Sequence, residues 1–454
     1  MPKSRVIVRR AIHDTSANFG VSASSARSGR ARRFGVESAK GCCGMVRARI
    51  SARLVKMARW CGGACALLAA AWCCAVTARV IRAPAPPPAP LDPAVRRNTD
   101  LVLVHTISRH GIRTPADTFP KDSHINDTFY PFGWGSLTND GRKQMYKMGQ
   151  YLRSRYDKFL GSLYTEKATF AQATGAARAR MSCELLLAGL WPPAGTALDW
   201  NPELNWQPIP VVTQELDDDS LLLVRRPCPR WDEAREEVVA SEDAQAKLAE
   251  YATVLKELTE QTGKTIKEFE DVLDVYTTLQ SEEATGVRLD DWVKDFFPEK
   301  LEPLAIESFM VNTYTDELIR LKGGLFLERL FSDWRAVIEG SKKQPARMSV
   351  FAGHDSTVAN VARALGAWQP QVPDFATTLL VELRRDPNTQ KYFVEIFQKN
   401  ATSSEAVQLV IDGCKPSCPL EKVFSLRGHL VPTDWKNECK ARDVTYTPPP
   451  QRGP

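Results

Sequence analysis

Two arginines flank a histidine in the segment Ser108-Arg109-His110-Gly111-Ile112-Arg113-Thr114-Pro115. Guanidinium groups match phosphate oxygens in geometry and charge, and an imidazole placed among them can attack phosphorus. Gly111 would allow the backbone to lie close to a bound oxyanion. Taken alone, an Arg-His-Gly tripeptide is more often part of a surface turn or a helix cap. The interpretation therefore depends on what accompanies these residues.

The apolar runs that precede the polar residues would position them. Residues 101–107 form a short apolar run of the kind that a buried parallel strand needs, and it ends where the polar segment begins. A second run, residues 348–352, ends in Gly353-His354-Asp355. Open α/β sheets bind ligands in the crevice beyond the carboxyl ends of their strands. We therefore expect the first polar segment to line such a crevice.

Strand and helix patterns alternate along much of the chain. Thr138 can cap an amphipathic helix running to about Tyr156, residues 168–174 suggest a strand, and residues 176–190 suggest a helix stopped by Trp191-Pro-Pro. Residues 375–383 and 392–398 suggest a hairpin. The alternation predicts an α/β fold with a largely parallel sheet flanked by helices, into which a helical cap is inserted.

The composition suggests where the parts of the chain begin and end. A Pro- and Ala-rich stretch precedes the first strand, and long Glu- and Lys-bearing helical stretches separate the two groups of strands. The predicted parts are an N-terminal extension with a signal peptide or signal anchor (1–78), a linker (79–97), the first part of the core (98–231), a helical cap (232–341), the second part of the core (342–440) and a flexible tail (441–454).

The motifs together resemble those of the histidine acid phosphatase family. The first segment is similar to the family signature Arg-His-Gly-x-Arg-x-Pro, and Gly353-His354-Asp355 is similar to its later His-Asp motif. The likeness is to the animal lysosomal, prostatic and insect venom acid phosphatases, and it implies a phosphoglycerate-mutase-like core. Further matches within residues 100 to 440 are Asn205-Trp-Gln-Pro, the Arg-Pro-Cys-Pro around Cys228, Lys322-Gly-Gly and Asp412-Gly-Cys-Lys-Pro-Ser-Cys-Pro.

This resemblance implies a role for each matching residue. His110 would be the nucleophile that forms a phosphohistidine, while Arg109 and Arg113 would hold the non-bridging phosphate oxygens. His354 would add a further donor. Asp355 would protonate the leaving alcohol, which requires a protonated carboxyl group and fits an acidic optimum. The scheme requires no metal or other cofactor, and the sequence lacks the Cys/His spacing typical of zinc sites.

The strand after the first predicted helix departs from the family pattern. Where the family has Arg-Ser-Thr-Asp-x-x-Arg, this chain begins with Gln172 and has Gly175 in place of the aspartate. The resemblance implies that the first arginine grips the phosphoryl group, so Gln172 would bind substrate without a charge and lower transition-state binding by about 10- to 100-fold. The final arginine, Arg178, is expected to lie on the helix surface like Arg180, and the alternative is that it reaches inward.

The charge distribution excludes a nucleic-acid partner. The chain carries a formal net charge of +6, but residues 1–78 hold 14 Lys and Arg against 2 Asp and Glu, which leaves −6 for the remainder. A mildly acidic body without basic runs lacks the electrostatic footprint of phosphate-backbone binding. The expected partner is a small-molecule or protein phosphomonoester, and the family likeness makes a homodimer plausible.

The segment from Met57 to Ala78 has the order of a signal peptide, with basic, apolar and then small residues. Cleavage after Ala78 predicts secretion or lysosomal delivery without stable membrane association. A retained signal anchor remains an alternative and would make the protein type II membrane-anchored, because about 18 apolar residues suffice to span a bilayer. Asn126-Asp-Thr and Asn400-Ala-Thr are glycosylation sequons consistent with secretion.

Five of the eleven cysteines follow the predicted cleavage site, and an oxidising compartment favours two disulfides and one buried thiol. Cys183 is the expected free cysteine because it lies in an apolar helical run. The family resemblance implies that Cys228 pairs with Cys439 and that Cys414 pairs with Cys418.

The sequence therefore predicts an acid phosphomonoesterase. The alternative is a catalytically impaired secreted relative that binds phosphorylated ligands, which the Gln172 and Gly175 substitutions suggest. A second open question concerns Phe132 and Trp134, which either line the substrate entrance or pack the loop after the signature.

Overall fold

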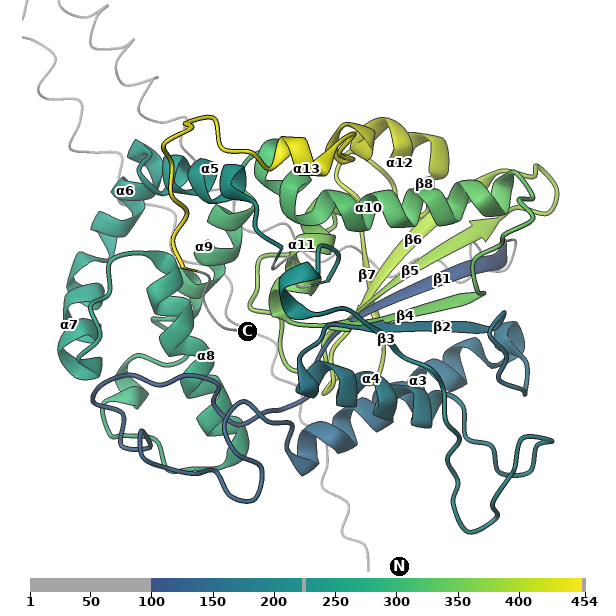
Figure 1. The fold of residues 1–454 in the computed structure, drawn as a ribbon, viewed down its shortest axis with the longest axis horizontal. Helices are drawn as coiled ribbons and strands as arrows, with labels where there is room; N and C mark the ends of the chain where they lie inside the picture. The colour runs from purple at the N-terminus through teal and green to yellow at the C-terminus, as the bar shows by residue number, and fades with distance from the viewer. Residues whose placement is uncertain (1–98, 223–225, 451–454) are drawn as a thin grey trace, which may run out of the picture. The chain divides into compact units, whose positions relative to one another are not determined.

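The computed structural model describes residues 99–222 and 226–450, and its central element is a mixed sheet. The strand order is β3-β2-β4-β1-β5-β6-β7, with β8 paired to β6 (Figure 1). The strands are β1 (Asp100–Arg109), β2 (Thr169–Ala173), β3 (Val212–Thr213), β4 (Met348–Gly353), β5 (Thr378–Arg385), β6 (Tyr392–Lys399), β7 (Val407–Leu409) and β8 (Cys418–Pro419).

Half of this sheet is parallel and half is antiparallel. Strands β3, β2, β4 and β1 run parallel, whereas β5, β6, β7 and β8 join by antiparallel pairing. The predicted α/β fold is confirmed, and the expectation of a largely parallel sheet is corrected to a mixed one. Within the antiparallel part, β5 and β6 form the predicted hairpin, whose short connection can join only antiparallel strands.

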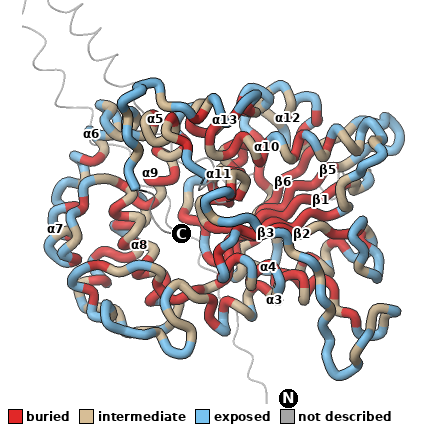
Figure 2. Tube along the Cα trace, in the orientation of Figure 1, coloured by how far each residue is buried: buried red, intermediate tan, exposed pale blue. Residues whose placement is uncertain are grey.

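Helices cover both faces of the sheet (Figure 1). The helices α3 (Asn139–Leu160) and α4 (Ala177–Leu190) pack on one face, and α10 (Asp316–Ile338), α11 (Asp355–Leu365) and α12 (Leu420–Arg427) pack on the other. Helix α3 is capped by Thr138, as predicted, but continues four residues beyond Tyr156. Apolar side chains from both layers enclose the strands, which form the most buried part of the fold (Figure 2).

A separate group of helices builds its own apolar core beside the sheet. These helices are α5 (Pro229–Val239), α6 (Glu242–Glu250), α7 (Ala252–Thr262), α8 (Phe269–Thr285) and α9 (Glu302–Asn312). Helix α10 lies at the end of the range predicted for the cap, yet Phe326, Leu330 and Trp334 place it in the core against the sheet. Short helices complete the described fold: η1 (Leu216–Asp218), η2 (Val293–Asp295), η3 (Gly428–Leu430) and α13 (Trp435–Glu438).

Two disulfides tie the later part of the chain to earlier elements. Cys228, at the start of α5, is bonded to Cys439 at the end of α13, and Cys414 is bonded to Cys418. These are the pairs that the family resemblance implies. Cys183 is free and buried, which confirms the prediction for that thiol.

The tail beyond residue 440, expected to be flexible, makes side-chain contacts with the helices. Arg442 forms an ion pair with Glu317, and the hydroxyl of Tyr446 donates a hydrogen bond to Glu236. The predicted signal segment and the linker lie outside the described residues. Across residues 99–222 and 226–450, the structure contains no helix that is long and apolar enough to cross a membrane.

A buried carboxyl group in the cap makes the stability of the protein depend on pH. Glu282 on α8 is 2% exposed, and burial together with the charge of Asp122 raises the pKa of Glu282 from 4.5 to about 8. Between these values the folded chain binds a proton that the unfolded chain has lost. Glu282 therefore makes the free energy of unfolding decrease as the pH rises from 4.5 towards about 8.

Replacing Glu282 with glutamine should remove this pH dependence, because a neutral amide cannot lose the proton. The free energy of unfolding of Glu282→Gln, relative to wild type, should increase by at most about 1.4 kcal/mol per pH unit across that interval. Urea denaturation at a series of pH values measures the difference. A difference that stays constant with pH would contradict the assignment.

Candidate active site

Three parallel strand ends bring the polar motifs of the sequence together. Strands β1 and β4 are in register with Arg109 opposite Gly353, and the backbone N–H of His110 donates to the Gly353 carbonyl at 3.0 Å. On the other side of β4, the N–H of Thr174 donates to the Ala352 carbonyl at 3.1 Å. The residues that follow β1, β2 and β4 therefore lie side by side at one edge of the sheet.

The hydrogen bonds of His110 determine which ring nitrogen is available for chemistry. Its Nδ1 lies 2.8 Å from the carbonyl oxygen of Gly111, and a carbonyl can only accept, so Nδ1 carries the proton. The Nε2 atom is then unprotonated, and it accepts a hydrogen bond from Nε of Arg178 at 3.1 Å. Nε2 thus has a lone pair directed at a guanidinium group.

Arg178 is the main correction to the sequence analysis. The expectation that it lies on the helix surface is wrong, because Arg178 is 8% exposed and bonded to His110 from the first turn of α4. Its Nη2 also lies 3.4 Å from Nδ1 of His354. The position had a readable signal, since the first turn of a helix that follows a parallel strand lies in the crevice where the neighbouring strands end.

The two signature arginines are held by the cap, a contact that no motif in the sequence indicates. Nη1 of Arg109 donates to Oε1 of Gln280 at 3.1 Å, and Nη1 of Arg113 donates to the hydroxyl of Ser281 at 3.0 Å. Both partners lie on α8. Within the described residues, the Nε atoms of Arg109 and Arg113 are buried without a hydrogen-bond partner. A bound oxyanion would supply the missing acceptors.

Gly111 is required at its position because of a close backbone approach. A Cβ atom at Gly111 would lie 2.4 Å from the carbonyl oxygen of Gly141 in α3, so the signature loop packs directly on the start of that helix. The hydroxyl of Ser182 on α4 accepts from the Gly111 N–H at 3.2 Å. Gly111 therefore has a packing role, and the expectation that it lets the backbone lie close to a bound oxyanion stays a prediction.

The second motif begins helix α11. His354 is the N-cap and Asp355 the first residue of this helix, and Nε2 of His354 lies 3.2 Å from the hydroxyl of Thr174. Oδ2 of Asp355 forms an ion pair with Nη2 of Arg109 at 3.1 Å. The rings of His110 and His354 meet edge to face with their centroids 5.3 Å apart. Both motifs predicted to carry chemistry are therefore in contact.

The charges of the site favour a neutral imidazole and a bound anion. Burial, followed by the positive charge of Arg178, lowers the pKa of His110 well below its ordinary value. Burial also lowers the pKa of Arg113 to about 9 and that of Arg178 to about 10, so both stay protonated in acid. Three guanidinium groups surround a histidine that resists protonation, and an anion relieves their mutual repulsion.

Gln172 lies within strand β2, before the end of the strand at which the charged groups of the site gather. It is 7% exposed in β2 and pairs in register with Phe351, two residues before the end of β4. In the same segment, Thr174 contacts His354, and Arg178 contacts both His110 and His354. Of the two sequons, Asn126 is exposed, whereas Asn400 is half-buried and its Oδ1 accepts from Gln398 at 3.0 Å.

Comparisons with known proteins were consistent along most of the chain. The family model of the histidine phosphatase superfamily (branch 2) matches residues 100–398. Prostatic acid phosphatase of Homo sapiens is 34% identical over 346 residues, covering 75% of this chain and 88% of the relative. A venom acid phosphatase of Apis mellifera is 32% identical, covering 76% and 89%, and lysosomal acid phosphatase of Homo sapiens is 32% identical, covering 76% and 81%.

Solved structures agree on the fold. A phytase of Hafnia alvei in complex with tartrate aligns with a TM-score of 0.58 at 18% identity, covering 76% of this chain and 99% of that chain. A phytase of Citrobacter braakii aligns with a TM-score of 0.58 at 19% identity, covering 75% and 99%. At these identities the likeness supports the arrangement of sheet and helices alone.

Proposed function

Because this chain belongs to the histidine phosphatase superfamily (branch 2), we propose that it is an acid phosphatase that hydrolyses phosphate monoesters through a phosphohistidine at His110. The observation that carries the proposal is the unprotonated Nε2 of His110, which lies among buried arginines. The relatives at 32 to 34% identity are acid phosphatases by name, which supports the reaction class.

In the first half-reaction, Nε2 of His110 attacks phosphorus and the bond to the leaving oxygen breaks. Arg109, Arg113 and Arg178 bind the non-bridging oxygens, whose negative charge they match in a buried site. His354 donates a further hydrogen bond. Asp355 gives its proton to the leaving oxygen, so the alcohol departs neutral and Asp355 becomes a carboxylate.

In the second half-reaction, water replaces the alcohol. The Asp355 carboxylate takes a proton from this water, the water oxygen attacks phosphorus, and the bond from phosphorus to Nε2 breaks. Inorganic phosphate leaves, His110 is again neutral and Asp355 is again protonated. Each group returns to its starting state, as a catalytic cycle requires.

The site is suited to acidic pH because of the environment of His110. An ordinary histidine protonates below about pH 6.5 and would lose its nucleophilic lone pair. Burial and the neighbouring arginines lower the pKa of His110 well below that value, so the neutral form persists in acid.

Replacing Asp355 with asparagine should slow the reaction in a way that depends on the leaving group. Phosphoenzyme formation from an alkyl phosphate should fall by about 10²- to 10⁴-fold, because an alkoxide leaves poorly without a proton. The fall for 4-nitrophenyl phosphate should be much smaller, since nitrophenolate needs no proton. Rapid-quench measurement of alcohol release, with wild type beside Asp355→Asn, separates the two effects.

Equal losses for both substrates would contradict the role of Asp355, and a folded wild type that hydrolyses neither would contradict the proposed function. The alternative of an impaired phosphoester-binding relative rested on the substitutions at Gln172 and Gly175. Arg178 supplies a third guanidinium beside His110, and no observation favours that alternative.

We also propose that the protein is processed in the secretory pathway, with cleavage after Ala78. The two disulfides and the exposed sequon at Asn126 support an oxidising compartment. N-terminal sequencing of secreted protein tests the cleavage site. A homodimer, which the family resemblance implies, stays a prediction.

A further inference from the structure

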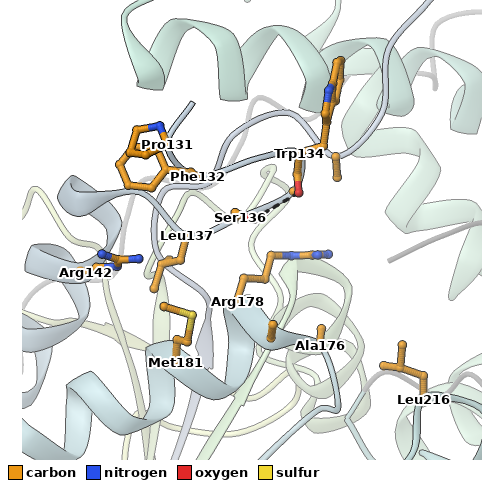
Figure 3. A pocket seen from close by; sticks show the side chains of 13 residues that line it. Pro131, Phe132, Trp134, Ser136, Leu137, Arg142, Ala176, Arg178, Met181 and Leu216 are labelled. Atoms are coloured by element: carbon orange, nitrogen blue, oxygen red, sulfur yellow. Dashed lines mark hydrogen bonds between the residues drawn. The ribbon is translucent and has the colours of Figure 1, made fainter. Parts of the chain in front are cut away.

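A cavity of about 500 Å³ lies beside the candidate active site (Figure 3). Arg178 belongs to both, because it contacts His110 through Nε and also lines the cavity. Under the proposed function, an ester bound by Arg178 at its phosphate has its alcohol part near this cavity. Among the other lining residues are Phe132, Trp134, Leu137, Arg142 and Met181. We call this space the alcohol cavity.

Apolar side chains form one part of the wall of the alcohol cavity, beside its polar residues. Figure 3 shows Leu137 and Met181 between the guanidinium ends of Arg142 and Arg178. The indole N–H of Trp134 donates to the Asp127 carbonyl at 2.8 Å, which fixes that side of the cavity. Phe132 and Trp134 both line this cavity. Such a surface suits an apolar or aromatic group.

A second cation lines the alcohol cavity at a distance from the phosphate site. Arg142 extends from α3, and its guanidinium carbon lies 5.7 Å from the centre of the Phe132 ring. Its Nε is buried and has no hydrogen-bond partner among the described residues, and its Nη1 donates to the amide oxygen of Asn139 at 3.1 Å. None of the ion pairs between described residues includes Arg142. Its charge is therefore not neutralised by a carboxylate of this part of the chain.

We propose that the alcohol cavity selects phosphate monoesters whose alcohol combines an apolar or aromatic body with a second anionic group that binds Arg142. The inference rests on the proposed function and deepens it by naming a substrate class. The apolar wall contacts the body of the alcohol, and the two arginines bind the two anionic ends. A carboxylate or phosphate on the alcohol supplies the acceptors that Arg142 lacks.

The test compares phenyl phosphate with 4-carboxyphenyl phosphate, which differ by one carboxylate. In wild type, 4-carboxyphenyl phosphate should have the lower KM. In Arg142→Met, the ratio of the KM of phenyl phosphate to that of 4-carboxyphenyl phosphate should fall by about tenfold, the range of one charge-assisted hydrogen bond in a half-exposed setting. Comparing the ratio between variants cancels the intrinsic reactivity of each ester.

Arg180→Met is the matched control, because Arg180 lies on α4 two residues from Arg178, is 58% exposed and does not line the alcohol cavity. It removes the same charge and should leave the KM ratio unchanged. A charge-reversed variant, Arg142→Glu, should instead prefer 4-(aminomethyl)phenyl phosphate over 4-carboxyphenyl phosphate. This second variant gives a positive signal that a merely unfolded protein could not give.

The outcomes separate the two levels of the proposal. Turnover of phenyl phosphate with an unchanged KM ratio in Arg142→Met would overturn the substrate class and leave the phosphatase function standing. An equal fall in the ratio for Arg180→Met would also overturn it, since the effect would then be long-range. Failure of folded wild type to hydrolyse either ester would overturn both levels.

Discussion

Replacing His110 with alanine should abolish the covalent phosphoenzyme and lower kcat by about 10⁴-fold or more, as for other enzymes that lose their nucleophile. Nε2 of His110 is the unprotonated nitrogen that accepts a hydrogen bond from Arg178, and alanine offers no atom that can bond to phosphorus. The measurement is rapid quench into alkali after mixing with labelled 4-nitrophenyl phosphate, because phosphohistidine is stable in alkali and hydrolyses in acid.

The control for this experiment is Asp355→Asn, which keeps the nucleophile. With 4-nitrophenyl phosphate it should form the phosphoenzyme and then accumulate it, because the base that activates water is missing. Loss of label in His110→Ala together with accumulation in Asp355→Asn assigns the two roles separately. If His110→Ala turned over substrate at a rate close to that of wild type, the phosphohistidine mechanism would be ruled out.

Replacing Arg178 with methionine should lower kcat/KM by about 10²- to 10³-fold, the effect of removing one buried donor to a developing oxyanion. Arg178 is the group closest to Nε2 of His110, and it also reaches His354. Because its charge adds to the forces that lower the pKa of His110, the acidic limb of the pH–rate profile should move to higher pH in the variant. Steady-state kinetics over a pH series measure both effects.

The variant Gln172→Arg tests whether position 172 or position 178 provides the arginine that binds the phosphoryl group. If Gln172 stood where the phosphate-binding arginine belongs, an arginine there would raise kcat/KM. Gln172 lies within β2 and is 7% exposed, so we expect no gain in activity and a lower melting temperature from an additional buried charge. A rise in kcat/KM in Gln172→Arg, together with unchanged activity in Arg178→Met, would reverse this assignment.

The predicted strands and helices were mostly found close to their expected residues. The apolar runs before the two motifs became β1 and β4, and the segment around residues 168–174 became β2. Such strands can be recognised in a sequence as short, continuous apolar runs, because a strand that is buried on both faces needs apolar side chains on both. The hairpin predicted for residues 375–383 and 392–398 is confirmed as the antiparallel pair β5 and β6.

The roles of the arginines were harder to read than the elements that carry them. Arg178 and Arg180 share one helix and differ by two positions, yet Arg178 points to His110 while Arg180 pairs with Glu184 in solvent. A helix turns by roughly 200° over two residues, so neighbouring arginines face opposite sides. Which side faces the site depends on how α4 packs against α3 and the sheet.

The sequence by itself determined the motif residues and the strand ends at which they stand. His110 and His354 follow apolar runs, and parallel pairing of two such runs brings the residues after them to the same edge. Only the tertiary structure decided the rest of the site. The proton on Nδ1 of His110, the inward turn of Arg178, and the support of Gln280 and Ser281 depend on contacts between distant segments. Local sequence patterns specify elements, whereas side-chain direction and hydrogen-bond partners are set by packing.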